Sequence, residues 1–111
     1  MEPRAKLWLE VEGKIALSEW RVALLEAVEE TGSLAKAAER LAVPYRTASY
    51  KIREIEEHLG VRLLTGQSGG AAGGGSRLTP EARELMRRWR AFSAGLDEWV
   101  AERFRAAFDP P

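Results

Sequence analysis

Hydrophobic residues recur with helical spacing after Ser18, a favourable N-cap residue. They occupy positions i, i+3, i+4, i+7 and i+8, which are Trp20, Ala23, Leu24, Ala27 and Val28. This period places them on one face and predicts an amphipathic helix. We expect the helix to end at Thr31-Gly32, because glycine readily adopts the left-handed conformation that terminates helices.

Two further helices are predicted on either side of a sharp turn. Ser33 can cap the first of them, which repeats the same spacing as far as Leu41. Pro44 interrupts the pattern, because proline disfavours helical geometry in the residue before it and suits the first turn of a new helix. The second helix is expected to end near Gly60. Its apolar face consists of Ala48, Ile52, Ile55 and Leu59.

Short strands flank these helices. Residues 6–12 and 61–65 have strand-like patterns, and residues 15–17 either pair back on the first strand or lead into the first helix. Residues 66–75 contain six glycines, and Arg77-Leu78-Thr79 can form the returning strand of a hairpin. Thr79-Pro80-Glu81 then favours the start of a last helix, which we expect to reach residue 108.

This order of elements predicts a mainly α fold with a small β-hairpin, the winged helix-turn-helix. A single domain is expected over residues 1–111. Its parts are the helix-turn-helix at about 18–59, the wing at about 61–79 and a long C-terminal dimerisation helix at about 80–108.

Composition excludes several kinds of chemistry. The 111 residues include no cysteine and one histidine, His58, so disulfides, thiol catalysis and multi-histidine metal sites are excluded. No apolar run approaches the roughly 20 residues that span a membrane, and the N-terminus lacks a secretory signal. No nucleophile–base pair or phosphate-cradling motif is present. We therefore expect a soluble cytoplasmic binding protein that is not an enzyme, with no catalytic residue, no metal and no cofactor.

The formal net charge is zero, but the charges are unevenly distributed. Residues 1–32 carry four basic and seven acidic side chains, residues 33–79 carry seven and four, and residues 80–111 carry six of each. The positive surplus lies in the middle third, which is where an anionic partner is expected to bind.

The third predicted helix has a polar face suited to such a partner. At about 100° per residue, Arg46, Tyr50 and Arg53 lie opposite the apolar face, with Thr47 and Ser49 beside them. No acid precedes Glu54 on this helix. A helix that enters the major groove by its N-terminal half needs this polarity, because that end carries the positive dipole and the donors for phosphates and bases.

Three groups of residues resemble the corresponding segments of a known protein family. They are Gly32-Ser33-Leu34 with Ala37-Ala38, Val43-Pro44-Tyr45-Arg46-Thr47-Ala48 with Ile52 and Ile55, and the glycine-rich segment that runs into Arg77-Leu78-Thr79. From about residue 7 to residue 105, the chain resembles the N-terminal DNA-binding domain of ModE-type molybdate-responsive transcriptional regulators. LysR-type regulators share part of this pattern, usually with a shorter wing.

The chain departs from that family at three points. It ends before the C-terminal molybdate-binding domains, so molybdate sensing is not carried over, and whether a separate effector-sensing protein supplies it stays open. Ala71 and Ala72 stand where such wings often place a basic residue, and Pro44 stands where a polar N-cap is usual. Fewer charges in the wing weaken the expected binding, because phosphate neutralisation supplies much of the affinity.

The resemblance and the helix geometry together imply roles for individual residues. Arg46 is expected to recognise a base edge, because the bidentate arginine–guanine contact is the commonest specific one. Lys51 and Arg53 are expected on phosphates, whereas Ser33 either caps its helix or also binds phosphate, and Tyr45 either packs or binds phosphate. The full predicted DNA-binding set is Ser33, Tyr45, Arg46, Thr47, Ser49, Tyr50, Lys51, Arg53, Gln67, Ser68 and Arg77.

The last helix carries a seam of hydrophobic residues with 4-3-4-3 spacing, which suits a partner helix. They are Leu85, Trp89, Phe92, Leu96 and Trp99. We expect a homodimer through this seam; the alternative is that the helix packs on the chain's own first helix. A two-fold dimer would place two recognition helices about 34 Å apart on a palindromic site.

The sequence therefore predicts a homodimeric transcriptional regulator that binds specific double-stranded DNA. Its recognition helix would lie in the major groove, and its glycine-rich wing would lie on the backbone or in the minor groove. The alternative is a protein–protein interaction adaptor that keeps the winged fold and docks a partner through the aromatic C-terminal helix. Neutral net charge and the wing's shortage of basic residues favour that alternative.

Overall fold

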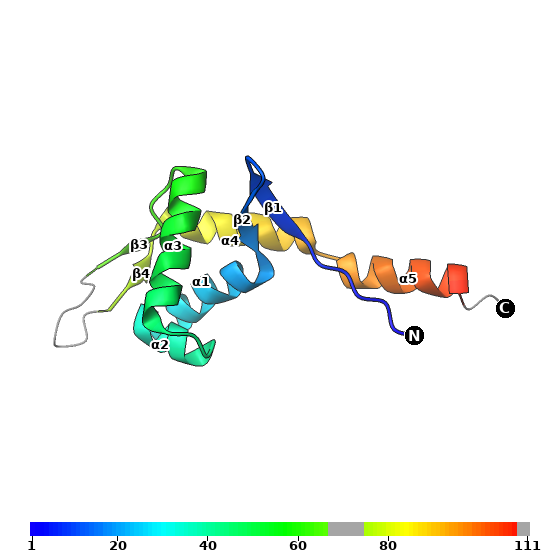
Figure 1. Cartoon of the computed structure of the whole chain (residues 1–111), viewed down its shortest axis with the longest axis horizontal. Helices are drawn as coiled ribbons and strands as arrows, with labels where there is room; N and C mark the ends of the chain where they lie inside the picture. Colours follow the sequence, from blue (N-terminus) through cyan, green and yellow to red (C-terminus); the bar gives the residue numbers. More distant parts are fainter. Residues whose placement is uncertain (67–74, 109–111) are drawn as a thin grey trace.

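The computed structural model describes residues 1–66 and 75–108. The elements are β1 (Trp8–Val11), β2 (Lys14–Ser18), α1 (Glu19–Thr31), α2 (Leu34–Arg40), α3 (Tyr45–Leu59), β3 (Leu64–Thr65), β4 (Arg77–Leu78), α4 (Pro80–Ser93) and α5 (Leu96–Phe108). The predicted mainly α fold with a small hairpin is confirmed. Helices α1 to α4 form the body, and α5 projects from it at the end opposite β3 and β4 (Figure 1).

The N-terminal strands form a hairpin of their own. β1 and β2 pair antiparallel, with Leu9 opposite Leu17, so the segment after the turn does pair back. Glu12 and Gly13 make the turn with φ angles of 52° and 79°. Ser18 ends the hairpin and caps α1 as predicted, accepting a hydrogen bond from the Arg21 backbone N–H at 3.2 Å.

Helix α1 lies at the centre of the hydrophobic core. Val22, Leu24, Leu25 and Val28 are all fully buried. The predicted set of buried residues was wrong in part. Trp20 is only partly buried, whereas Val22 and Leu25, which the prediction left out, lie in the core. The reason is that β2, β4, α2, α3 and α4 all contact α1, so it is covered on more than one side.

The strands of the wing are shorter than the predicted 61–65 and 77–79. Only Leu64 pairs with Leu78 and Thr65 with Arg77. The Leu63 N–H donates to the Glu56 carboxylate at 2.8 Å and not to a strand partner. Thr79 caps α4, where its hydroxyl accepts from the Ala82 N–H at 3.0 Å. One backbone hydrogen bond still joins these ends, since the Thr79 N–H donates to the Leu63 carbonyl at 2.9 Å.

The stem of the wing is fastened to the turn between α1 and α2. The Ser76 N–H donates to the Gly32 carbonyl at 2.9 Å. A Cβ at Gly75 would come within 2.8 Å of that carbonyl oxygen, and a Cβ at Gly66 within 2.6 Å of the Gly75 oxygen. Both glycines are required by these close backbone approaches. The stem is thereby fixed relative to the helix-turn-helix.

The C-terminal helix is present but divided. Ala94 is extended, with φ −60° and ψ 136°, and Gly95 has a left-handed φ of 79°. The Gly95 carbonyl accepts from the Trp99 N–H at 2.9 Å and so begins α5. The sequence pattern did not reveal this break. Gly95 falls between Phe92 and Leu96, so the regular spacing of hydrophobic residues in the predicted seam continues across it. In residues 1–66 and 75–108, no helix is long and apolar enough to cross a membrane.

Candidate nucleic-acid interface

Helix α3 separates its apolar and polar residues onto opposite faces, as predicted. Ala48, Ile52 and Ile55 are buried in the core. On the other side Arg46 and Arg53 are exposed, and Tyr50 is 52% exposed. The three polar residues therefore share one solvent-facing surface, as a helix that inserts into a DNA groove requires.

The N-terminus of α3 is open to solvent. Pro44 occupies the N-cap position and provides no side-chain cap, and its carbonyl accepts from the Thr47 and Ala48 N–H groups at 3.0 and 3.2 Å. The first N–H groups of a helix have no partner within the helix and carry its positive partial charge. Tyr45 stands beside them and is 46% exposed.

A largely buried ion pair anchors α3 to α1. The Arg21 Nη2 atom donates to the Glu54 Oε1 atom at 3.0 Å, and the Arg21 side chain is only 8% exposed. Lys51 also approaches Glu54, with 3.7 Å between Nζ and Oε1, and its Nζ lies 5.9 Å from the Tyr50 ring centroid. The sequence analysis did not include this pair, because it joins residues that lie 33 positions apart.

The pair predicts an acid-sensitive contribution to stability. Partial burial raises the pKa of the Glu54 carboxyl, but the charges of Arg21 and Lys51 outweigh it and hold the pKa below 4.5. A carboxyl whose pKa is lowered by folding adds stability that is fully present above its unfolded pKa and is lost as the pH falls through its folded pKa. We expect Glu54→Gln to be destabilised at neutral pH, and the difference from wild type to shrink below about pH 4.5.

Denaturant unfolding of both chains across this pH range measures that difference. Glu84 also has a lowered pKa, of about 2, caused by hydrogen bonds from Arg87 and Arg88. It is present in both chains and cancels from the comparison. A gap that stays constant with pH would show that the Glu54 charge does not stabilise the fold.

A groove runs between α3 and the stem of the wing. Its volume is about 450 Å³, and its lining includes Tyr45, Ser49, Arg53, Arg62 and Thr65. Arg62 is exposed and was missed by the sequence analysis. The sequence signal for Arg62 was its position next to the buried Leu63. In an extended chain, neighbouring side chains point to opposite sides, so Arg62 could have been expected to face solvent. Polar and basic side chains thus continue from α3 toward the wing.

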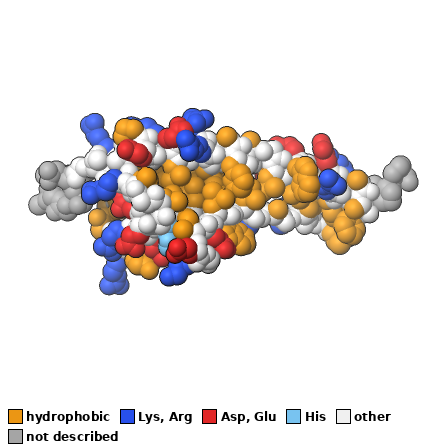
Figure 2. All heavy atoms as spheres, turned by 90° about the horizontal axis from the view of Figure 1, so that it is seen from above, with side chains coloured by type: hydrophobic (Ala, Val, Ile, Leu, Met, Phe, Trp, Pro, Cys, Tyr) orange, Lys and Arg blue, Asp and Glu red, His pale blue; other side chains and the backbone are white. Residues whose placement is uncertain are grey.

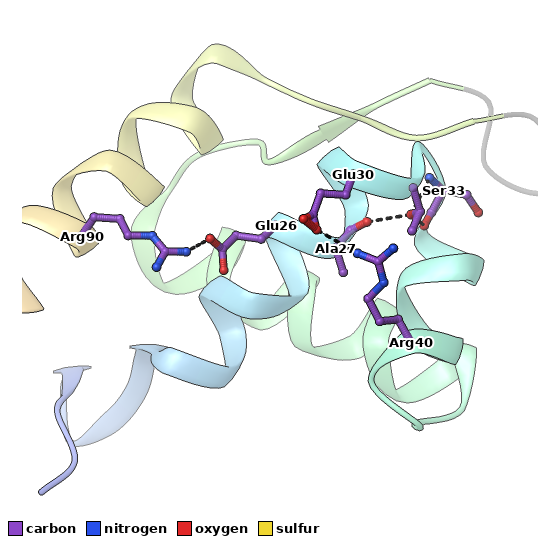
Figure 3. A network of polar contacts seen from close by, with 7 residues as sticks. Glu26, Ala27, Glu30, Ser33, Arg40 and Arg90 are labelled. Atoms are coloured by element: carbon purple, nitrogen blue, oxygen red, sulfur yellow. Dashed lines mark hydrogen bonds and ion pairs between the residues drawn. The ribbon is translucent and has the colours of Figure 1, made fainter.

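Several other arginines are neutralised by α1. Glu26, Glu29 and Glu30 pair with Arg90, Arg83 and Arg40, respectively. Figure 3 shows the Arg90 and Arg40 pairs on either side of α1. By contrast, no acidic side chain within residues 1–66 and 75–108 pairs with Arg46, Arg53, Arg62 or Arg77.

The remaining predicted residues occupy different environments. Ser33 caps α2, its hydroxyl accepting from the Lys36 N–H at 3.2 Å. Arg77 is exposed on β4, and Gln67 and Ser68 lie outside the described residues. In the predicted dimer seam, Trp89 is 2% exposed and donates its indole N–H to Glu19 at 2.8 Å. Leu85 packs against the core, while Phe92 and Trp99 remain about half exposed.

Three helices followed by a hairpin wing, with the third helix facing solvent, define a winged helix-turn-helix protein. Residues 21–83 match the family model of the bacterial regulatory helix-turn-helix proteins of the lysR family. The chain belongs to this family.

Two curated relatives connect the chain to molybdenum proteins. It is 37% identical over 76 residues to the molybdenum-pterin-binding protein MopB of Rhodobacter capsulatus, a match that covers 68% of this chain and 28% of MopB. It is 33% identical over 87 residues to the molybdenum transport protein ModE of Azotobacter vinelandii, covering 78% of this chain and 32% of ModE. The chain thus spans about a third or less of the length of these relatives.

Solved structures show the same fold. The CbnR DNA-binding domain in complex with DNA matches with a TM-score of 0.60 and 30% identity, covering 79% of this chain and 94% of that domain. The BenM DNA-binding domain in complex with the catB site 1 DNA matches with a TM-score of 0.58 and 27% identity, covering 80% and 93%. The predicted resemblance to ModE-type and LysR-type domains is confirmed.

Proposed function

We propose that this chain binds specific double-stranded DNA as a transcriptional regulator. The observation that carries the proposal is the exposed face of α3, on which Arg46, Tyr50 and Arg53 stand beside the groove that leads to the wing. Membership of a family of bacterial regulatory helix-turn-helix proteins supports it. Two of the similar structures are themselves complexes with DNA.

In this proposal α3 enters the major groove. Arg46 recognises a base edge, and Thr47, Ser49 and Tyr50 contact bases or backbone. Arg53, Arg62 and Arg77 bind phosphates and fix the register, since most backbone contacts position a protein without reading sequence. Lys51 contributes less, because Glu54 already neutralises part of its charge. The wing lies on the backbone or in the minor groove.

We further propose that two copies bind as a homodimer. A two-fold axis would present two α3 helices about 34 Å apart to a palindromic site. Because Trp89 belongs to the chain's own core, the surface that remains for the partner centres on Leu96 and Trp99.

Salt dependence of DNA binding tests the proposal. Three arginines per copy, Arg53, Arg62 and Arg77, would neutralise about six phosphates per dimer, so log Kobs is expected to fall with log salt with a slope of about −5. The site is first selected from a random duplex pool, and binding is then measured by fluorescence anisotropy. Selected sequences are expected to show two-fold symmetry.

The same titrations would also reveal whether the proposed DNA binding is wrong. If no duplex binds at low salt, the regulator proposal is wrong, and the interaction adaptor becomes the better account of the exposed aromatic side chains. A slope near zero with tight binding would show that the arginines do not contact phosphates.

A further inference from the structure

Three of the four tryptophans in this chain line one groove. Its volume is about 810 Å³, and it lies between the N-terminal hairpin, the start of α1 and the joint between α4 and α5. Trp8 stands on β1, Trp20 on α1 and Trp89 on α4. Figure 2 shows hydrophobic side chains on the body and again on the projecting end that holds α5. Small-molecule sites have this size and are lined mainly by hydrophobic and aromatic side chains.

The groove presents the rings of these tryptophans more than their hydrogen-bond donors. The Trp8 indole N–H donates to the Glu10 carboxylate at 2.7 Å, and the Trp89 indole N–H donates to the Glu19 carboxylate at 2.8 Å. Trp89 is almost fully buried, whereas Trp8 is 48% exposed and Trp20 is partly buried. Trp8 and Trp20 therefore supply most of the accessible ring surface, and the face of an indole ring attracts cations.

The charged side chains around the groove are mainly acidic. They are Glu19 on α1 and Asp97 and Glu98 in the first turn of α5. Within residues 1–66 and 75–108, no basic side chain pairs with these three carboxylates. Two basic residues also line the groove, but Arg90 is paired with Glu26 (Figure 3), which leaves Lys6. The groove therefore has a negative balance of charge and favours a cation.

The fourth tryptophan lies outside the groove and already has a cation on its ring. The Arg103 Cζ atom is 4.9 Å from the Trp99 ring centroid. In the part of the chain that the structure describes, no lysine or arginine lies over the ring of Trp8, Trp20 or Trp89. The groove thus gathers tryptophan rings and carboxylates without a cation from the chain itself on those rings.

We propose that this groove binds a small organic cation with a hydrophobic body, an arylalkylamine or a quaternary ammonium compound. The rings of Trp8 and Trp20 bind the cationic head, and Ile15 and Leu96 pack against the hydrophobic body. The three carboxylates favour a cation over an anion or a neutral ligand. The site is separate from α3 and the wing, so the inference depends neither on DNA binding nor on the homodimer.

A titration with benzyltrimethylammonium, followed by proton–nitrogen correlation NMR, tests the site on the whole chain. The indole N–H signals of Trp8, Trp20 and Trp89 are expected to shift until the groove is saturated. The Trp99 signal is expected to stay in place, because that ring lies outside the groove and Arg103 covers it. Benzyl alcohol carries the same phenylmethyl group without the charge, and it is expected to bind about two- to 30-fold more weakly.

Replacement of one ring separates the aromatic contribution from the hydrophobic one. Trp8→Leu keeps a hydrophobic side chain on β1 and removes the indole, so it is expected to weaken binding of the cation about two- to fivefold. Binding of benzyl alcohol is expected to change much less. Trp99→Leu is the matched control and is expected to change neither affinity.

Charge variants at exposed positions give a second measurement. Asp97→Asn is expected to weaken binding of the cation and Lys6→Gln to strengthen it, each by about 1.5- to fivefold at low salt. Glu102→Gln removes a charge from the same helix outside the groove and is expected to have no effect. Opposite signs at Asp97 and Lys6 would support the cation site even if Trp8→Leu disturbed the hairpin.

Three results would overturn the inference. The first is the absence of shifts at the groove tryptophans, or equal shifts at all four indoles. The second is equal affinity for the cation and for benzyl alcohol, which would make the groove merely hydrophobic. The third is an affinity for the cation that falls as the protein concentration rises, because a second copy would then cover the groove. None of them bears on the proposed DNA binding.

Discussion

Replacing Arg46 by alanine is expected to lower affinity for the selected DNA site by about five- to 150-fold, equivalent to about 1–3 kcal/mol, and to relax the preference at one base position. The side chain is exposed at the open end of α3, and no acidic partner among the described residues competes for it. In the proposed complex, its removal would eliminate a bidentate hydrogen bond to a base edge. Anisotropy titrations against the site and its single-base variants measure both effects.

Alanine variants of two other arginines serve as comparisons for Arg46→Ala. Arg53→Ala should weaken binding almost equally for all sequences and reduce the magnitude of the salt slope by about 1 for each phosphate that is no longer neutralised. Arg88→Ala should leave DNA binding unchanged, because Arg88 pairs with Glu84 on α4. If Arg46→Ala behaves as Arg88→Ala does, Arg46 does not recognise a base.

Trp89→Ala should produce the largest loss of folding stability, about 3–5 kcal/mol, as for other large aromatic residues removed from cores. Trp89 is 2% exposed within a single chain, and its indole N–H is bound by Glu19. Truncation leaves a cavity against α1, whereas the Glu19 carboxylate is exposed and can bind water in place of the indole N–H. Urea unfolding at several protein concentrations measures the free energy.

Phe92→Ala is the matched control for that measurement. Phe92 lies one turn further along α4, its ring centroid 5.8 Å from that of Trp89, but it is half exposed. Its removal is expected to cost much less. A core role for Trp89 predicts the same loss at every protein concentration, whereas a role in the dimer seam would make the loss depend on concentration.

Local signals predicted most elements and the polar face of α3. Ser18, Ser33 and Thr79 each cap the helix that they were expected to cap. These features depend on neighbouring residues, which sequence patterns describe well. The side of α3 that faces solvent followed from helical period alone, because only one face of that helix meets the core.

Features set by distant contacts could not be predicted in this way. Val22 and Leu25 are buried because several elements surround α1. A periodic pattern of hydrophobic residues predicts burial of only one face of a helix. The assignment of Trp89 to the core rather than the seam required knowing where α4 lies. The break at Gly95 was hidden because the hydrophobic spacing continues across it. The position of Arg62 beside α3 depends on the groove between α3 and the stem of the wing, which Arg62 lines.

The glutamates of α1 also have a kinetic consequence. By neutralising Arg40, Arg83 and Arg90, they leave Arg46, Arg53 and Arg62 as a separate pole of positive potential on a molecule with no net charge. Such a molecule has a dipole moment but little overall attraction to a polyanion. If the chain binds DNA as proposed, the field of the duplex would therefore act mainly as a torque over the last ~8 Å, the screening length in physiological salt. In the proposed complex, this torque would turn α3 toward the groove and raise the fraction of collisions that are productive.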